Sequence, residues 1–366
     1  MAYAPSANGL YTNNSLHTRN RGSHVQLARA EARSVTIGRL LGRLSIPVAA
    51  ISLALAAAGC HVPGTSSGSI LPSGQTLTVA EVPGIDTVPL EVAVRQGLFK
   101  QQGISVTVKD YASVSDAYNA LIQGKADVAD GDYTSFFYGI ANLGASLKLV
   151  ADGYDASSGT MQVLALPSSG INSPGELVHR TVATPEAQIA PYSSIFPYSM
   201  DTLATETVLQ TEGVNPAEIT WDAMPENKMI AALKDHQVQA IVATDPLIIQ
   251  AETQLGAQEV LDACSGVTAN LPLSGYFSTA SFAGQHSAAL QAFRTALTTA
   301  ESDAGQRSNV QSVLRGQEMN SLYADLVNIG QYPSFLNVGQ VQRIADLMYD
   351  SGMIVSPVSV QGLLVK

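Results

Sequence analysis

The stretch from Val88 to Phe136 constrains the fold of this chain more than any other. It alternates amphipathic helical patterns with short apolar strand patterns, and each helical pattern ends at a glycine, the residue that most easily takes the left-handed conformation after a helix. A βαβα alternation with short loops predicts an α/β fold with a mostly parallel sheet flanked by helices. The expected elements are helix 88–96, strand 104–108, helix 116–123 and strand 127–129.

Polar residues follow the expected strands of this first half, which starts with strand 76–79. In open α/β sheets, ligands bind just beyond the carboxyl ends of the strands. The first turn of a helix also offers free N–H groups to a ligand. We therefore expect ligand contacts here, although Asp132 can equally cap the helix expected over 133–140. The candidate residues are Asp86, Ser113, Asp132, Tyr133 and Thr134.

A second βα series begins near Met161 and supplies candidates of its own. Asp245 is expected to be the N-cap of helix 247–255 with Pro246 at N1, or to contact the ligand. The aromatics of the proline-broken loop 189–200 form either a stacking wall for a ligand or local packing over this half. The candidate residues are Tyr154, in the polar link 153–160, with Glu186, Tyr192, Tyr198 and Asp245.

Several phrases of the sequence, in order, resemble one protein family. They are ALIQGKADVADGDYTS (120–135), GINSPGEL (170–177), the pair Asp245-Pro246 and the phrase GYFS (275–278). This set resembles the solute-binding proteins of ABC importers, in the nitrate/sulfonate/taurine and thiamine-precursor group, over about residues 76–353. The resemblance implies a periplasmic binding protein type II fold, in which two lobes enclose a ligand cleft. It also implies binding without catalysis or cofactor, as a monomer beside permease and ATPase subunits.

The N-terminal region has the features of an export signal. An uncharged apolar run, 46–58, follows Arg39 and Arg43, and it is shorter than the ~20 residues that a spanning helix needs. The ending LAAAGC resembles a bacterial lipobox, which implies lipidation of Cys60 and anchoring at the outer face of the cytoplasmic membrane. The Gly-, Ser- and Pro-rich residues that follow would be a tether. The alternative is an uncleaved anchor or a buried helix.

These observations together predict the domain organisation. The expected segments are 1–59 leader and signal peptide, 60–74 flexible tether, 75–158 first part of lobe 1, 159–272 lobe 2, and 273–366 the return to lobe 1 with its C-terminal helices.

Composition excludes several classes of function. Without residues 1–59 the chain keeps 13 basic and 29 acidic residues, a poor match to nucleic acid. Only two cysteines are present, Cys60 and Cys264, so no disulfide framework is expected. No CxxC or HxxxH spacing indicates a metal site, and no GxxxxGK[ST] motif indicates a nucleotide enzyme.

The charges of the candidate loops bear on the class of ligand. These loops hold several carboxylates and no Arg or Lys, which favours a neutral or cationic nitrogenous ring of the thiamine-pyrimidine kind, stacked on tyrosines. Three alternatives stay open: an alkanesulfonate, taurine or nitrate anion in the same kind of site; a lipoprotein sensor; and an enzyme on this fold, such as a pyrimidine-precursor synthase. The Cys-rich iron-binding run of such synthases has no counterpart here.

Overall fold

The computed structural model describes residues 74–185, 199–317 and 319–365 of the chain. The predictions for Cys60, the export signal and most of the tether lie outside these residues, as do those for Glu186, Tyr192 and Tyr198. No helix within these ranges has the length and apolar character needed to cross a bilayer.

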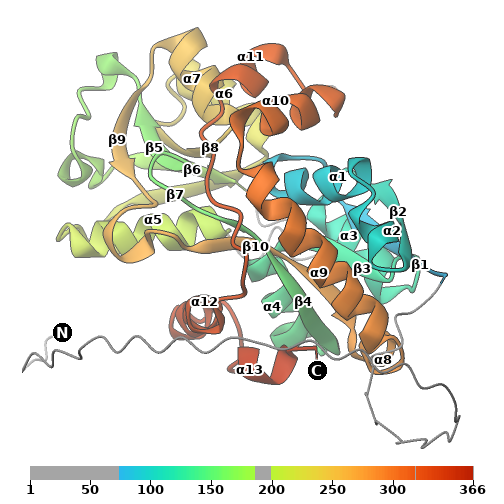
Figure 1. Cartoon of the computed structure of the whole chain (residues 1–366). Helices are drawn as coiled ribbons and strands as arrows, with labels where there is room; N and C mark the ends of the chain where they lie inside the picture. The colour runs from blue at the N-terminus through green and yellow to red at the C-terminus, as the bar shows by residue number, and fades with distance from the viewer. Residues whose placement is uncertain (1–73, 186–198, 318, 366) are drawn as a thin grey trace, which may run out of the picture. The chain divides into compact units, whose positions relative to one another are not determined.

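Two five-stranded sheets form the framework, and they belong to the same compact unit of the chain (Figure 1). Sheet A has the strand order β2-β1-β3-β10-β4, and sheet B has the order β7-β6-β8-β5-β9. The strands of sheet A are β1 (Gln75–Glu81), β2 (Ile104–Asp110), β3 (Val128–Asp132), β4 (Leu147–Asp155) and β10 (Pro272–Thr279). Those of sheet B are β5 (Met161–Ala165), β6 (Thr181–Pro185), β7 (Thr220–Met224), β8 (Ala240–Thr244) and β9 (Gln258–Asp262).

Both sheets are mixed, but in each of them four of the five strands run parallel to one another, so the prediction of mostly parallel sheets is confirmed. In sheet A, β1 pairs in parallel with β2 and β3, whereas β10 pairs antiparallel with β3 and β4. In sheet B, β6 pairs in parallel with β7 and β8, whereas β5 pairs antiparallel with β8 and β9. The predicted α/β class and its two-sheet arrangement are confirmed. Hydrophobic periodicity gives the position of a strand but not its direction, which is why the antiparallel direction of β5 and β10 was not predicted.

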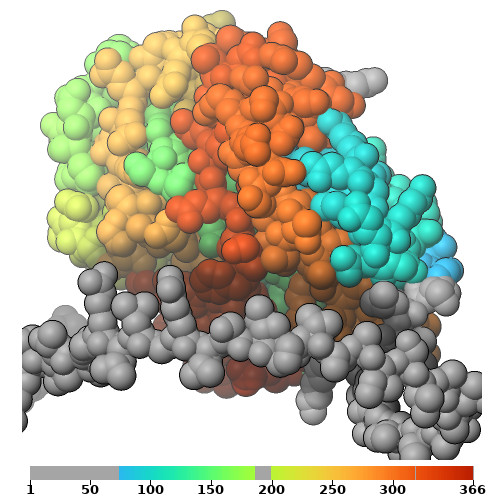
Figure 2. Space-filling model, viewed as in Figure 1, coloured from blue at the N-terminus to red at the C-terminus, as the bar shows by residue number. Residues whose placement is uncertain are grey.

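Helices cover both sheets, largely where their periodicity predicted them. Those around sheet A are α1 (Val88–Arg95), α2 (Leu98–Gln101), α3 (Val114–Ile122), α4 (Tyr133–Leu143), α8 (Ala280–Gln285), α9 (Ser287–Ala304), α10 (Arg307–Gly316), α12 (Val338–Asp350) and α13 (Val360–Leu363). Those around sheet B are α5 (Met200–Thr211), α6 (Glu226–Lys234) and α7 (Leu247–Leu255), and α11 (Ser321–Leu326) follows α10. The expected link over 98–103 instead contains α2, which packs on α9. In the space-filling view, α9 and α10 in orange lie against the cyan surface of α1 and α2 (Figure 2).

Local sequence signals fix several helix ends. Gly97 and Gly124 take left-handed conformations, at φ 67° and 68°, as their positions after helical patterns predicted. The capping box between Ser173 and Glu176 is also present, at the start of a short 3₁₀ helix, Pro174–Leu177.

An aromatic cluster forms the core between sheet A and α4. The rings of Phe136 and Phe277 stack at a centroid distance of 4.1 Å, and Tyr133 and Phe137 pack against Phe277 at 5.8 and 6.4 Å. All four residues are fully buried. The cluster holds the first turn of α4 against β10 and thereby positions the polar strand ends described next.

Candidate functional site

Four carboxyl groups lie together at the carboxyl ends of β1 and β3 and in the short 3₁₀ helix Ile85–Thr87: Glu81, Asp86, Asp130 and Asp132. We call this set the strand-end acids. Burial, and then the charges of Glu91 and Asp110, raises the pKa of Glu81 to about 8. Burial also raises the pKa of Asp86 to about 6, against the effect of the nearby Ser274 hydroxyl. For Asp130, burial and then the neighbouring charges of Asp86, Glu81 and Asp132 hold the pKa well above its usual value.

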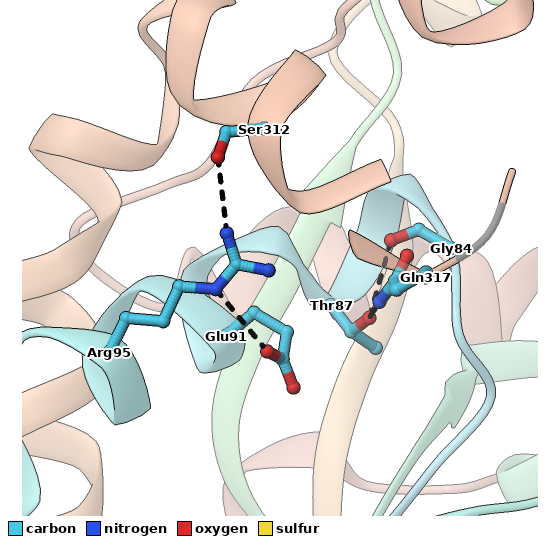
Figure 3. Close-up of polar contacts among 6 residues, drawn as sticks. All are labelled: Gly84, Thr87, Glu91, Arg95, Ser312 and Gln317. Atoms are coloured by element: carbon cyan, nitrogen blue, oxygen red, sulfur yellow. Dashed lines mark hydrogen bonds and ion pairs between the residues drawn. The ribbon is translucent and has the colours of Figure 1, made fainter. Parts of the chain in front are cut away.

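Hydrogen bonds fix the loop that carries Asp86 (Figure 3). The Thr87 hydroxyl donates to the carbonyl of Gly84 at 3.2 Å and accepts from the Gln317 side chain at 3.3 Å. On α1, Arg95 lies 3.8 Å from Glu91 and also donates to the Ser312 hydroxyl of α10 at 3.3 Å. The loop after β1 is therefore held by the segment around α10, which comes from far along the chain.

Asp132 is the N-cap of α4, which was one of the two roles predicted for it. Its carboxylate accepts from the Ser135 backbone N–H at 2.6 Å and from the Ser135 hydroxyl at 2.7 Å, and the Thr134 hydroxyl donates to it as well. Three donors next to the carboxylate compensate its charge locally.

The side chains of Tyr133 and Thr134 are buried and are not exposed to a ligand. The Tyr133 ring is fully buried in the aromatic core, and its hydroxyl donates to Oδ1 of Asp152 at 2.6 Å. Thr134 is buried, with its hydroxyl on Asp132. The Tyr133 ring therefore fills a core position. The N–H groups of this helical turn remain the expected contribution of both residues.

Ser113 is also a helix cap. Its hydroxyl accepts from the Asp116 backbone N–H at 3.1 Å and donates to the Asp116 carboxylate at 2.8 Å, at the start of α3. Both hydrogen-bonding functions of the hydroxyl are thus occupied in the structure.

Sheet B brings its own carboxyl to this region through Asp201, in the first turn of α5. Burial, followed by the charge of Glu226 and also by that of Asp132, raises the pKa of Asp201 to about 7. The interaction with Asp132 places this residue near the strand-end acids of sheet A. The sequence analysis missed Asp201; the signal that could have found it is an acidic residue in the first turn of a helix, two positions after the N-cap Ser199.

Asp245 connects sheet B to the segment after α11 and is not the N-cap of α7. The helix starts at Leu247 with Pro246 at its N-cap, so Asp245 lies one residue too early. Its Oδ2 accepts from the Asn328 backbone N–H at 2.8 Å, and its buried Oδ1 has no hydrogen-bond partner. Burial raises the pKa of Asp245 to about 6, while the amides of Asn328 and Ile249 oppose the rise.

Tyr154 lies at the end of β4 and is buried, because this strand extends into what the sequence suggested was a polar link. Its hydroxyl accepts from the Gly330 N–H at 2.6 Å, and its ring packs against Tyr332 at 5.4 Å. Burial raises the pKa of Tyr154, and the charges of Asp86 and Asp245 add to the rise. The charges that act on Tyr154 thus come from carboxyls of both sheets.

Two observations limit the chemistry of the described residues. Cys264 is a buried free thiol whose pKa burial raises to about 12, so it is a poor nucleophile. Within residues 74–185, 199–317 and 319–365, no three His, Cys, Asp or Glu side chains are grouped as a metal site requires. The region offers carboxyls, hydroxyls and backbone amides, which are groups that bind a small polar molecule.

Replacing Asp132 separates its capping role from its charge. Asp132→Ala is expected to lower the free energy of unfolding by about 1 kcal/mol, because it leaves the Ser135 N–H and two hydroxyls without their acceptor. Asp132→Asn is the matched control and should lose much less, because asparagine caps helices as well as aspartate. Urea unfolding measures both, and equal losses for the two variants would contradict the capping role.

Comparison with known proteins identifies the family to which the chain belongs. Residues 72–315 match the NMT1-like family. No curated protein sequence matches the chain.

Three solved structures illustrate the likeness in fold. The periplasmic aliphatic sulphonate binding protein SsuA from Escherichia coli has a TM-score of 0.64 at 16% identity, over 80% of this chain and 97% of that one. The periplasmic nitrate-binding protein NrtA from Synechocystis PCC 6803 has a TM-score of 0.62 at 14% identity, over 80% and 85%. The desulfurization enzyme DSZB has a TM-score of 0.57 at 14% identity, over 79% and 96%.

At such identities these likenesses establish the fold, and the family match establishes the lineage. The resemblance stated from the sequence is confirmed by both. The chain is a member of the NMT1-like family, with the α/β fold of the periplasmic sulfonate- and nitrate-binding proteins.

Proposed function

We propose that this protein is the solute-binding subunit of an ABC importer and captures a small molecule between two lobes. The lobes would be residues 75–158 with 273–366, built on sheet A, and residues 159–272, built on sheet B. The observation that carries the proposal is the meeting of polar groups from both sheets. Asp245, after β8 of sheet B, accepts from the Asn328 N–H at 2.8 Å, and Tyr154 of sheet A accepts from the Gly330 N–H at 2.6 Å, two residues further along the same segment. The charge of Asp132 of sheet A is also among the causes that raise the pKa of Asp201 beside sheet B.

The same proposal covers location and partners. Export, lipidation of Cys60 and a tether up to residue 74 would place the subunit at the outer face of the cytoplasmic membrane, as a monomer beside its permease and ATPase subunits. A lipoprotein sensor would use the same site and anchor. The family match and its fold support the importer role.

The relatives favour an anionic solute over the nitrogenous ring that the loop charges suggested. SsuA and NrtA are named for binding sulfonates and nitrate. The carboxyl groups of the candidate site also repel a bound anion less strongly than their number suggests. Asp132 already has three hydrogen-bond donors. Asp86 and Asp201 have pKa values of about 6 and about 7, so either can take up a proton near neutral pH and become a donor to an anion. We therefore propose a sulfonate- or nitrate-type anion.

Ligand affinity is expected to depend on pH with a sign that reports the ligand's charge. If each bound anion adds one proton to Asp86 or Asp201, its association constant should rise by up to about tenfold per pH unit as the pH falls from about 9 towards the pKa of that group, about 6 or about 7, and should level off below it. A cationic ligand should show the opposite slope. The measurement is calorimetric titration of the protein with ethanesulfonate, nitrate and an aminopyrimidine across this range.

A matched variant tests the site itself. Asp201→Asn should strengthen sulfonate binding at neutral pH and flatten its pH dependence, because the amide cannot ionise. Glu259→Gln removes an acid from β9 and should change neither property. Preferential binding of the aminopyrimidine, tighter at high pH, would overturn the anion proposal. If Asp201→Asn altered the binding of none of these solutes, the placement of the site would be overturned.

The fold alone does not exclude an enzyme, since DSZB shares it. No arrangement among the described residues favours that function, because the thiol of Cys264 is buried and has a raised pKa.

A further inference from the structure

A pocket lies on sheet A, beside α9, and none of the strand-end acids lines it. Its volume is about 420 Å³, and it is bounded by β4, α9 and the segment 333–336. The residues that matter for its chemistry are Asp152 of β4, then Arg294, Thr298 and Glu301 of α9, and Phe335.

Two of these residues are buried carboxyls with unsatisfied oxygens. Asp152 and Glu301 are only 3% and 4% exposed. Oδ1 of Asp152 accepts from the Tyr133 hydroxyl at 2.6 Å and from the Gly153 N–H at 3.3 Å, but its Oδ2 has no partner of ordinary geometry. Oε2 of Glu301 also has none. Because a buried polar atom without a partner costs free energy, two of them in one pocket point to a donor that binds there.

We propose that this pocket binds a small organic cation, an alkylammonium group, which donates to Asp152 and Glu301 beside the ring of Phe335. An ammonium group carries three N–H donors, which suits two carboxylates and a hydroxyl such as that of Thr298. Phe335 lines the pocket with 71% of its surface exposed, so its ring is free to cover a cation.

The alternatives fit less well. A metal ion requires more ligands than two carboxyls, and the described part of the chain groups no three metal-binding side chains. Arg294 lies seven positions before Glu301 on α9, two turns away, and forms no ion pair within the described residues. Arg294 lines the pocket but leaves both carboxyls without an ion-pair partner in the part of the chain that the structure describes.

The charge state of the carboxyls makes binding depend on pH. Burial, and then the charges of Asp152 and Asp155, raises the pKa of Glu301 to about 8. Burial raises the pKa of Asp152 to about 6, while the Tyr133 hydroxyl and the amides of Gly153 and Asn337 oppose the rise. The other titratable or charged groups around the pair are Tyr133, Asp155, Tyr276 and Arg294. A cation binds the ionised carboxylates, so it should displace the proton of Glu301, and its affinity should rise with pH until that carboxyl is ionised.

The test is calorimetric titration of the full-length chain with propylammonium, and with 1-propanol as the uncharged analogue. Propylammonium, but not 1-propanol, is expected to bind saturably. Its association constant should rise about tenfold per pH unit up to the pKa of Glu301. The same titration in buffers of different ionisation enthalpy should reveal one proton released per cation bound. Binding of both compounds alike, or of neither above that pKa, would overturn the proposal.

Variants assign the binding to this pocket. Glu301→Gln should weaken propylammonium binding at least about tenfold and abolish the proton release. Phe335→Ala, at an exposed position that the fold does not need, should weaken it about two- to fivefold. Glu259→Gln removes the same charge elsewhere and should leave it unchanged. Unaltered binding in both Glu301→Gln and Phe335→Ala would place the cation elsewhere and refute the inference.

Discussion

Lowering the pH from about 8 to about 5 is expected to stabilise the folded protein, whereas many proteins lose stability on acidification. Burial is the first cause that raises the pKa values of Glu81, Asp155 and Glu301 to about 8. The folded state therefore binds more protons than the unfolded state, whose carboxyls keep values near 4. The stabilising contribution of each group is complete below the unfolded pKa and is lost as the pH rises through the folded pKa, at roughly 1.4 kcal/mol per pH unit. Thermal unfolding across this range should show the melting temperature rising by several degrees on acidification.

A single variant isolates one contribution to this slope. Glu81→Gln keeps the shape of a buried side chain that lies beside Thr87 and Gln317 but removes its titration. The variant should be more stable than the original protein at about pH 8 and should have a shallower pH dependence. Glu212→Gln, at the exposed C-cap of α5, is the control and should leave the slope unchanged. A melting temperature that falls steadily from about pH 8 to about pH 5 would show that the buried carboxyls are ionised in the folded state.

Phe277→Ala is expected to lower the free energy of unfolding by about 3–5 kcal/mol, the range for truncating a buried aromatic residue. Phe277 is fully buried, stacks on Phe136 at 4.1 Å and meets the edges of Tyr133 and Phe137. Its loss leaves a cavity between sheet A and α4 that rigid neighbours cannot close. Denaturant unfolding monitored by circular dichroism measures the loss.

The matched control for this core is Phe335→Ala. Phe335 is 71% exposed, so its removal should change stability by no more than about 0.5 kcal/mol. Similar losses in the two variants would mean that the aromatic cluster does not hold α4 on the sheet.

Short-range signals in the sequence were sufficient for most of the fold. The αL glycines 97 and 124, the capping box at Ser173 and the cap Asp132 all depend on a few neighbouring residues, and each is found where it was predicted. Strand direction depends on contacts made far along the chain, so the antiparallel insertion of β5 and β10 was missed.

The candidate site was predictable as a region but not in its atomic detail. The strand-end rule led to Asp86 and Asp132, and the charge of Asp132 is one of the causes that raise the pKa of Asp86 in the structure. It could not show that Tyr133 turns into the core, since that depends on Asp152 and Phe277. It also treated all the acids as charged, because the burial that raises the pKa of Asp86 is a property of the folded chain alone.

The stretch between α11 and α12 has one consequence for how this sequence can vary. Its main chain makes several of the contacts that tie it to both sheets: the N–H groups of Asn328, Gly330 and Gln331 donate to Asp245, Tyr154 and Asp155. The length of this stretch therefore cannot vary, because an inserted or deleted residue would shift every donor away from its acceptor. Gly330 is constrained in identity as well, because a Cβ there would lie 2.2 Å from the carbonyl oxygen of Asp155. A segment without regular secondary structure is thus constrained in length as strictly as a strand in a sheet.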